Sequence, residues 1–150
     1  MDKHVIGVIG GRDVDDRMLM IAEAVGEKIA KSGSLLLCGG LGGVMEAAAK
    51  GAKNHGGVTI GILPQEDRGY ANEYIDIPVA TGLGMGRNVI ISCTADVLIA
   101  IGGGYGTLSE IAFALQLGKQ VVGIETWKIE EVREAADAED AVRKALRLSS

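Results

Sequence analysis

Aromatic side chains are scarce in this chain of 150 residues, which has one Phe, one Trp and three Tyr. A core must therefore be built mainly from Val, Ile, Leu and Ala, within an apolar share of 47%. Buried parallel sheets covered by Ala-rich helices have this kind of composition. The length fits one domain spanning residues 1–150, which is large enough to bury a core without disulfides.

Basic runs, paired cysteines and long hydrophobic segments are also missing. A net charge of −5 without a basic run argues against a nucleic-acid groove or an anionic membrane as the main partner. Cys38 and Cys93 lack C-x-x-C spacing, which favours buried reduced thiols over a disulfide or a metal site. No 18 apolar residues are consecutive, and the first apolar run is too short for a signal peptide. We therefore expect a cytoplasmic protein with no metal site.

Glycine is abundant, with 23 residues gathered in clusters at 10–11, 39–43, 56–57, 82–86 and 102–106. Most clusters end a short apolar run or a helical pattern, so they mark turns. The patterns predict strands near residues 4–9, 35–38, 58–64, 74–77, 96–101 and 120–124, and helices over 13–32, 44–55, 87–94 and 107–118. A terminal amphipathic helix is predicted to hold Ile129, Val132, Ala136, Val142 and Ala145 on one face.

Strands that alternate with helices predict an α/β fold. We expect a three-layer, Rossmann-like, doubly wound parallel sheet with helices on both faces. In such a sheet every turn from strand to helix lies at the carboxyl edge, where ligands bind at the point of reversed strand order. The glycine turns at 10–11, 39–43 and 102–106 should therefore meet there and form a phosphate site.

The segment from Gly102 to Glu110 is compatible with several known patterns. No Walker A motif is present, and the dinucleotide fingerprint is incomplete because Ser109 stands where its third glycine should be. Glu125 nonetheless stands where a ribose-binding carboxylate could lie. Thr107-x-x-Glu110 also fits a helix capping box, although a plain cap would not require three preceding glycines. Glu110 can thus be a cap or a residue that faces a ligand.

Three stretches carry a resemblance to a known superfamily: GGGYGTLSE (102–110), MGRN (85–88) and LLLCGGLGGVMEAAAKGA (35–52). They resemble the SLOG superfamily, long labelled "possible lysine decarboxylase", which includes LONELY GUY cytokinin phosphoribohydrolases and molybdenum-cofactor carrier proteins. The resemblance implies a Rossmann-like fold. Lysine decarboxylation is not expected, because the sequence presents no pyridoxal-phosphate Schiff-base site.

The hydrolases of this superfamily carry PGGxGTxxE with an upstream Arg-Lys pair. Gly103, Gly104, Gly106, Thr107 and Glu110 match the first motif, and Arg87 matches the arginine. Gly102 replaces the proline and Asn88 the lysine, which is more similar to the short carrier branch. The resemblance therefore favours a carrier or sensor of a phosphorylated heterocycle, with a nucleoside 5′-monophosphate phosphoribohydrolase as the alternative.

The resemblance and the turns together define a set of candidate residues. If the protein is an enzyme, the catalytic residues are Glu110 and Arg87. No cofactor is required, but a nucleoside monophosphate or a molybdenum cofactor could be bound, and a homodimer or homotetramer is expected. The expected ligand-binding residues are Gly10, Gly11, Arg12, Gly39, Gly40, Gly42, Gly43, Gly103, Gly104, Tyr105, Gly106 and Thr107.

Overall fold

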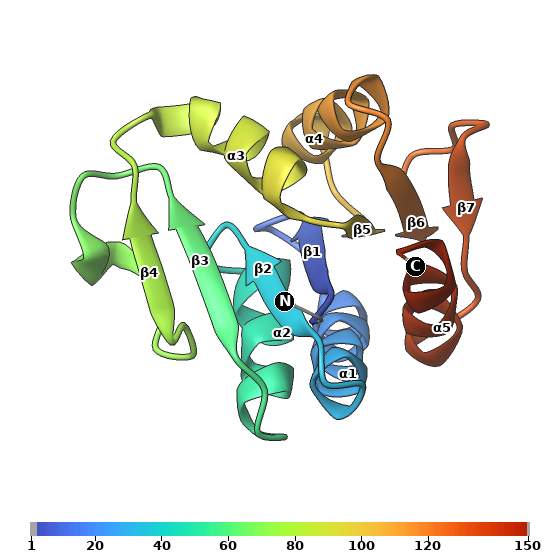
Figure 1. Ribbon diagram of the computed structural model, residues 1–150, viewed down its shortest axis with the longest axis horizontal. Coiled ribbons are helices and arrows are strands. Elements are labelled where there is room, and N and C mark those ends of the chain that lie inside the picture. The colour runs from blue at the N-terminus through green and yellow to red at the C-terminus, as the bar shows by residue number, and fades with distance from the viewer. Residues whose placement is uncertain (1–2, 150) are drawn as a thin grey trace.

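The computed structural model describes residues 3–149, which form an α/β fold around a parallel sheet of seven strands (Figure 1). The strand order is β4-β3-β2-β1-β5-β6-β7, and every neighbouring pair is parallel. The order reverses between β1 and β5, so the switch point expected for a ligand lies there. The strands are β1 (Val5–Gly10), β2 (Leu35–Cys38), β3 (Thr59–Leu63), β4 (Ile77–Ala80), β5 (Val97–Ile101), β6 (Gln120–Ile124) and β7 (Val132–Glu134).

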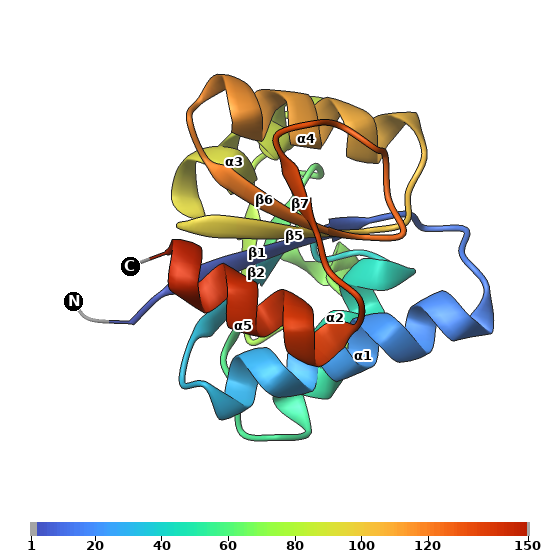
Figure 2. The same ribbon diagram turned by 90° about the vertical axis from the view of Figure 1, so that its right-hand side faces the viewer.

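Helices cover both faces of the sheet, which confirms the predicted three layers (Figure 2). One face carries α1 (Asp16–Lys31), α2 (Val44–Lys53) and α5 (Ala138–Leu148), and the other carries α3 (Arg87–Thr94) and α4 (Tyr105–Gln116). Two short 3₁₀ turns, η1 (Arg68–Tyr70) and η2 (Gly84–Gly86), lie in the connections. Each face has its own core of aliphatic side chains, as the shortage of aromatic residues predicted. No helix within residues 3–149 is long and apolar enough to cross a bilayer.

The Ala-rich helix α2 packs closely on α1. A Cβ atom at Gly26 would collide with the carbonyl oxygen of Ala48, and one at Gly51 would collide with that of Glu23. The two helices therefore meet backbone to backbone, and Ala48 and Ala52 are fully buried. The small residues of α2 serve packing within this chain.

The prediction for the last segment was wrong in its first half. Val132 lies in β7, where it pairs with Val121 of β6, and the helix begins only at Ala138. Asp137 caps this helix by accepting a hydrogen bond from the backbone N–H of Asp140 (2.8 Å). The periodic pattern was misleading because Val132, the one buried residue of this short edge strand, matches helical spacing by chance.

Two smaller predictions also need correction. The strand expected at 74–77 is shifted to Ile77–Ala80, because Tyr74 and Asp76 are held in a polar network described below. Cys93 is exposed at the end of α3, whereas Cys38 is buried as expected. Both cysteines are free thiols.

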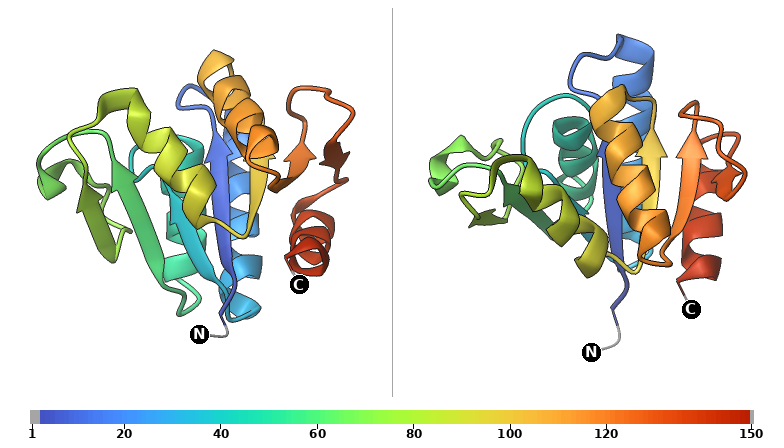
Figure 3. Two further views of the ribbon diagram at one scale, coloured as in Figure 1. Left: turned by 45° about the horizontal axis from the view of Figure 1, so that its top comes forward. Right: turned by 90° about the horizontal axis from the view of Figure 1, so that it is seen from above.

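The carboxyl ends of the strands all point toward one edge of the molecule (Figure 3). The turns after β1, β2 and β5 therefore meet at that edge. The fold brings together three glycine clusters that are separated by about 30 to 60 residues in the sequence.

Candidate functional site

A cavity of about 630 Å³ opens at the carboxyl edge, at the switch point between β1 and β5. Its volume is in the range of small-molecule sites in proteins. The cavity brings together most of the residues predicted from the sequence: Gly10, Gly11, Arg12, Gly39, Arg87, Gly103, Gly104, Gly106, Thr107 and Glu110.

The start of α4 presents unpaired backbone donors to this cavity. Within the described chain, the N–H groups of residues 103–107 donate no backbone hydrogen bond, since the first bond of the helix runs from Leu108 N to Gly104 O (3.0 Å). Gly104 occupies the N-cap position and has no side chain to satisfy these donors. A helix start with free N–H groups attracts an anion.

Two glycines are required by the protein itself. Gly10 lies where β1 meets β5 and α2, and its Cβ would lie 2.6 Å from the carbonyl oxygen of Ile101. Gly103 has a φ of +101°, and its Cβ would collide with Thr107. Both positions can therefore be explained by the fold alone.

Gly104 and Gly106 have no such explanation. Gly104 has a φ of −103°, which any residue can adopt, and Gly106 lies within α4. A Cβ at either position would have no protein atom within 4 Å. Both glycines line the cavity, so the space that their missing side chains leave is open to a ligand.

Glu110 lies one turn into α4 and faces the same cavity. Burial raises the pKa of its carboxyl group to about 7, although the positive charge of Arg87 acts in the opposite direction. A substantial fraction of Glu110 is therefore protonated near neutral pH, and this protonated form can donate a hydrogen bond or a proton. A carboxyl group of this kind is typical of functional sites.

Arg87, the first residue of α3, ties two strand ends together. Its Nη1 donates to the carbonyl oxygens of Gly39 and Ile62, both at 2.6 Å. Its Nε is buried without a hydrogen-bond partner among residues 3–149. Burial lowers the pKa of the guanidinium, Glu110 raises it and nearby Arg12 lowers it. Arg87 thus holds two strand ends through Nη1, and its Nε remains without a partner in a side chain that lines the cavity.

The charge of the cavity depends on Glu110. Arg12 and Arg87 contribute two positive charges, and Asp13 contributes one negative charge. Arg12 is exposed at the rim and makes no ion pair with any described residue. With Glu110 protonated the lining is net positive, and with Glu110 ionised it is neutral.

Four predicted residues lie outside the cavity lining. Gly42 and Gly43 line shallower hollows beside it, and Gly40 packs against Leu63 and Gly61. Tyr105 points away from the cavity side and stacks on Trp127, with ring centroids 6.0 Å apart.

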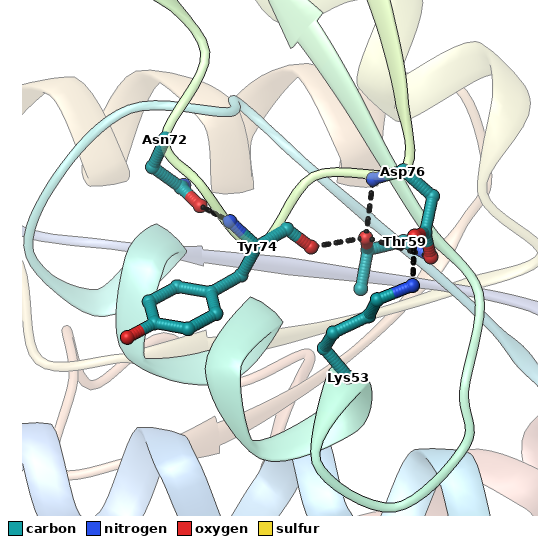
Figure 4. A network of polar contacts seen from close by, with 5 residues as sticks. All are labelled: Lys53, Thr59, Asn72, Tyr74 and Asp76. Carbon is teal, nitrogen blue, oxygen red and sulfur yellow. Dashed lines mark hydrogen bonds and ion pairs between the residues drawn. The ribbon is translucent and has the colours of Figure 1, made fainter.

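The second glycine turn is held from outside by Asn72. Its Nδ2 donates to the carbonyl oxygen of Leu41 (2.8 Å), and its Oδ1 accepts from Tyr74 N (2.9 Å). Figure 4 shows how this loop is fixed further on: the carbonyl of Tyr74 accepts from the Thr59 hydroxyl (2.6 Å), and Asp76 pairs with Lys53. This polar network positions the turn without lining the cavity.

Sequence reasoning missed several residues of the cavity. Asn88 was seen only as the replacement of a lysine, but it lines the cavity and its buried Oδ1 has no partner among the described residues. The position of Asn88 directly after Arg87 was the sequence signal that could have placed it at the site. Apolar side chains complete the lining: Val8, Ile9, Val14, Met45 and Met85.

The structure bears on both alternative interpretations of the motif. The capping box is wrong, because α4 begins at Tyr105 and Thr107 lies buried in its first turn. Glu125 lies outside the cavity lining and pairs with Arg17, with 2.8 Å between Arg17 Nη1 and Glu125 Oε1. In residues 3–149 no group of three His, Cys, Asp or Glu side chains could hold a metal ion.

Comparison with known proteins agrees with this geometry. The model of the SLOG cluster4 family matches residues 3–148. The chain belongs to this family. That membership confirms the resemblance found in the sequence.

Solved structures of family relatives are similar over the whole chain. The molybdenum cofactor binding protein of Rippkaea orientalis has a TM-score of 0.94 and 37% identity, covering 100% of this chain and 99% of that one. The molybdenum cofactor carrier protein of Chlamydomonas reinhardtii has a TM-score of 0.88 and 38% identity, covering 97% and 98%. A cytokinin riboside 5′-monophosphate phosphoribohydrolase of Mycobacterium marinum is 32% identical over 119 residues, which are 73% of this chain and 64% of that protein.

Proposed function

We propose that this SLOG protein binds a phosphorylated heterocycle, either a nucleotide or a molybdopterin-type cofactor, and acts as a carrier or sensor. The observation that carries the proposal is the pair Gly104 and Gly106, which leave open a space that the fold does not need. Free N–H groups at residues 103–107 and the two arginines Arg12 and Arg87 surround this space. A phosphate bound there would accept hydrogen bonds from the backbone and face net positive charge.

The rest of the cavity suits a ring system. Ile9, Val14, Met45 and Met85 supply apolar surface, and Asn88 supplies a polar group beside it. Ligand sites commonly combine apolar surface of this kind with polar groups that fix the orientation of the ligand. The similarity to molybdenum cofactor carrier proteins supports a pterin, and the similarity to the phosphoribohydrolase supports a nucleotide.

Native mass spectrometry of gently purified protein tests this proposal. We expect an added mass that corresponds to a phosphorylated heterocycle and is lost on activation of the ions. Protein that carries no ligand, and that takes up neither guanosine 5′-monophosphate (GMP) nor adenosine 5′-monophosphate (AMP) when they are added, would contradict it.

Hydrolysis of a nucleoside 5′-monophosphate is the second candidate, favoured by the raised pKa of Glu110 next to Arg87. A protonated Glu110 could donate its proton as a general acid while the N-glycosidic bond breaks. Asn88 and Gly102 stand where the hydrolases carry Lys and Pro, so we expect little or no turnover.

Chromatography for free base, after incubation with several nucleoside 5′-monophosphates, distinguishes the carrier from the enzyme. The carrier predicts no release of base by the wild-type protein. Robust release that falls by about 10²–10⁴-fold in Glu110→Gln, and also falls in Arg87→Ala, would instead establish the enzyme.

We further propose that the chain forms a homodimer or homotetramer through the outer surface formed by β4, the η2 segment before α3, and α4. Large apolar side chains gather there with exposures between 39 and 76%: Ile77, Val79, Leu83, Met85, Phe113 and Leu117. Within α4 the only charged residue is Glu110, which faces the cavity. Exposed apolar faces of this kind are typical of symmetric interfaces.

A further inference from the structure

A three-residue segment after β6 holds the glycine turn at 102–104 through side-chain hydrogen bonds to its carbonyl oxygens. The hydroxyl of Thr126 donates to the carbonyl oxygen of Gly102 (2.6 Å), and Nε1 of Trp127 donates to the carbonyl oxygen of Gly104 (3.0 Å). We call residues Glu125, Thr126 and Trp127 the clasp. The two bonds hold alternate carbonyls of the turn that lies under the candidate phosphate.

The clasp is also paired with α1, the helix that follows one wall of the cavity. Glu125 accepts two hydrogen bonds from the guanidinium of Arg17 in α1. The segment leading into α1 forms that wall through Arg12, Asp13 and Val14. The clasp therefore links the glycine turn to the helix that follows this wall.

Glu125 adopts a backbone conformation that favours glycine. Its φ is +48°, and no other non-glycine residue in the described chain has a positive φ. Such a conformation is unfavourable for a residue with a side chain and is retained where the surrounding structure needs it. Here it turns the chain so that Thr126 and Trp127 both point at the glycine turn.

Because the peptide bond is planar, the two hydrogen bonds to carbonyl oxygens also fix the directions of the neighbouring N–H groups. In a trans peptide, the C=O of one residue and the N–H of the next lie in one plane and point in opposite directions. No described peptide bond is cis. Fixing the carbonyl of Gly102 therefore fixes the direction of the Gly103 N–H, and fixing that of Gly104 fixes the N–H of Tyr105.

We propose that Thr126 and Trp127 are positioning residues that fix the directions of two N–H groups at the glycine turn, that of Gly103, which lines the cavity, and that of Tyr105 beside it. This inference rests on the proposed phosphate binding. Gly102 and Gly103 flank the first of these peptides and Gly104 precedes the second, so both could otherwise rotate. An ordered donor set binds an anion more tightly than a mobile one. Stacking of Tyr105 on Trp127 holds the indole in place.

The pair Thr126→Val and Thr126→Ser gives the sharpest test. Val keeps the shape but loses the hydroxyl donor, whereas Ser keeps the donor. In calorimetric titrations with GMP we expect Thr126→Val to weaken binding about fivefold, as for the loss of one hydrogen bond, and Thr126→Ser to bind like the wild type. Trp127→Phe, which retains an aromatic ring against Tyr105, should weaken binding to a similar extent. Binding of guanosine, which lacks the phosphate, should not change.

A second readout needs no ligand. Backbone ¹⁵N relaxation should show order parameters at Gly103 and Tyr105 near the rigid value of about 0.85 in the wild type and clearly lower values in Thr126→Val. If Thr126→Ser loses as much GMP affinity as Thr126→Val, or if the order parameters do not change, the inference is overturned. If the wild type does not bind GMP but the order parameters fall, phosphate binding fails while the positioning of the turn stands.

Discussion

At the scale of single residues, the structure explains why a carboxyl group stands one turn into a helix that attracts anions. Glu110 is partly buried in the cavity wall, and this burial raises its pKa to about 7. In its protonated form it does not repel a phosphate, and it leaves the lining with a net positive charge. The sequence motif left open whether Glu110 is a helix cap or faces a ligand, and its protonation depends on burial, which the sequence does not report.

Glu110 should make the stability of the protein depend on pH. Because the folded state raises this pKa above the ordinary value of about 4.5, the folded state binds the proton more tightly than the unfolded chain. The resulting stabilisation is complete below about pH 4.5 and is lost as the pH rises through about 7. In Glu110→Gln this loss is absent, so the variant should gain about 2 kcal/mol of unfolding free energy relative to wild type between pH 5 and pH 8.

Urea denaturation at several pH values measures this difference. The exposed Glu130 offers a control, because Glu130→Gln should follow the wild-type pH dependence. A difference between Glu110→Gln and wild type that stays constant from pH 5 to pH 8 would show that burial of Glu110 does not raise its pKa.

At the scale of elements, the strand-turn-helix units around the site followed the predictions closely. The α3 range was predicted at its observed bounds, and α4 starts two residues earlier than expected, at Tyr105. That small shift has a large consequence, since it turns Thr107 from a cap into a buried residue of the first turn. Helix ends depend on tertiary contacts, here the carbonyl of Gly104 held by Trp127, which a local motif does not contain.

The side-chain hydrogen bonds that hold the glycine turns from distant parts of the sequence could not be predicted. Thr126, Trp127 and Asn72 hold the glycine turns through side chains that are 23 to 32 residues away in sequence. None of them belongs to a recognisable motif, and each acts on a backbone carbonyl. Similarly, residues 132–134 pair as an edge strand with β6 although their spacing also fits a helix.

At the scale of the whole molecule, the two helical layers differ in chemistry. The layer of α1, α2 and α5 carries charged residues in every helix, whereas α4 has a single charged residue. The α3 and α4 layer should therefore be covered in solution, and Met85, which lines the cavity, is part of its exposed face. The native mass spectra that report ligand should accordingly show a dimer or tetramer, and a monomer at micromolar concentration would contradict the proposed self-association.

The central claim is that the backbone of the glycine turn binds a phosphate, and a calorimetric titration of Gly104→Ala tests it most directly. Gly104 has an ordinary φ and free space around its Cβ, so Ala should leave the fold intact while occupying the space of the phosphate. Gly86→Ala is the matched control, because its φ is −61° and its Cβ would make only ordinary contact with Leu83. We predict that GMP binds the wild type and Gly86→Ala with equal affinity. Gly104→Ala should bind GMP at least about tenfold more weakly, which corresponds to about 1.4 kcal/mol of binding free energy. Guanosine should bind all three proteins weakly. Equal affinity of folded Gly104→Ala and wild type for GMP would contradict the account.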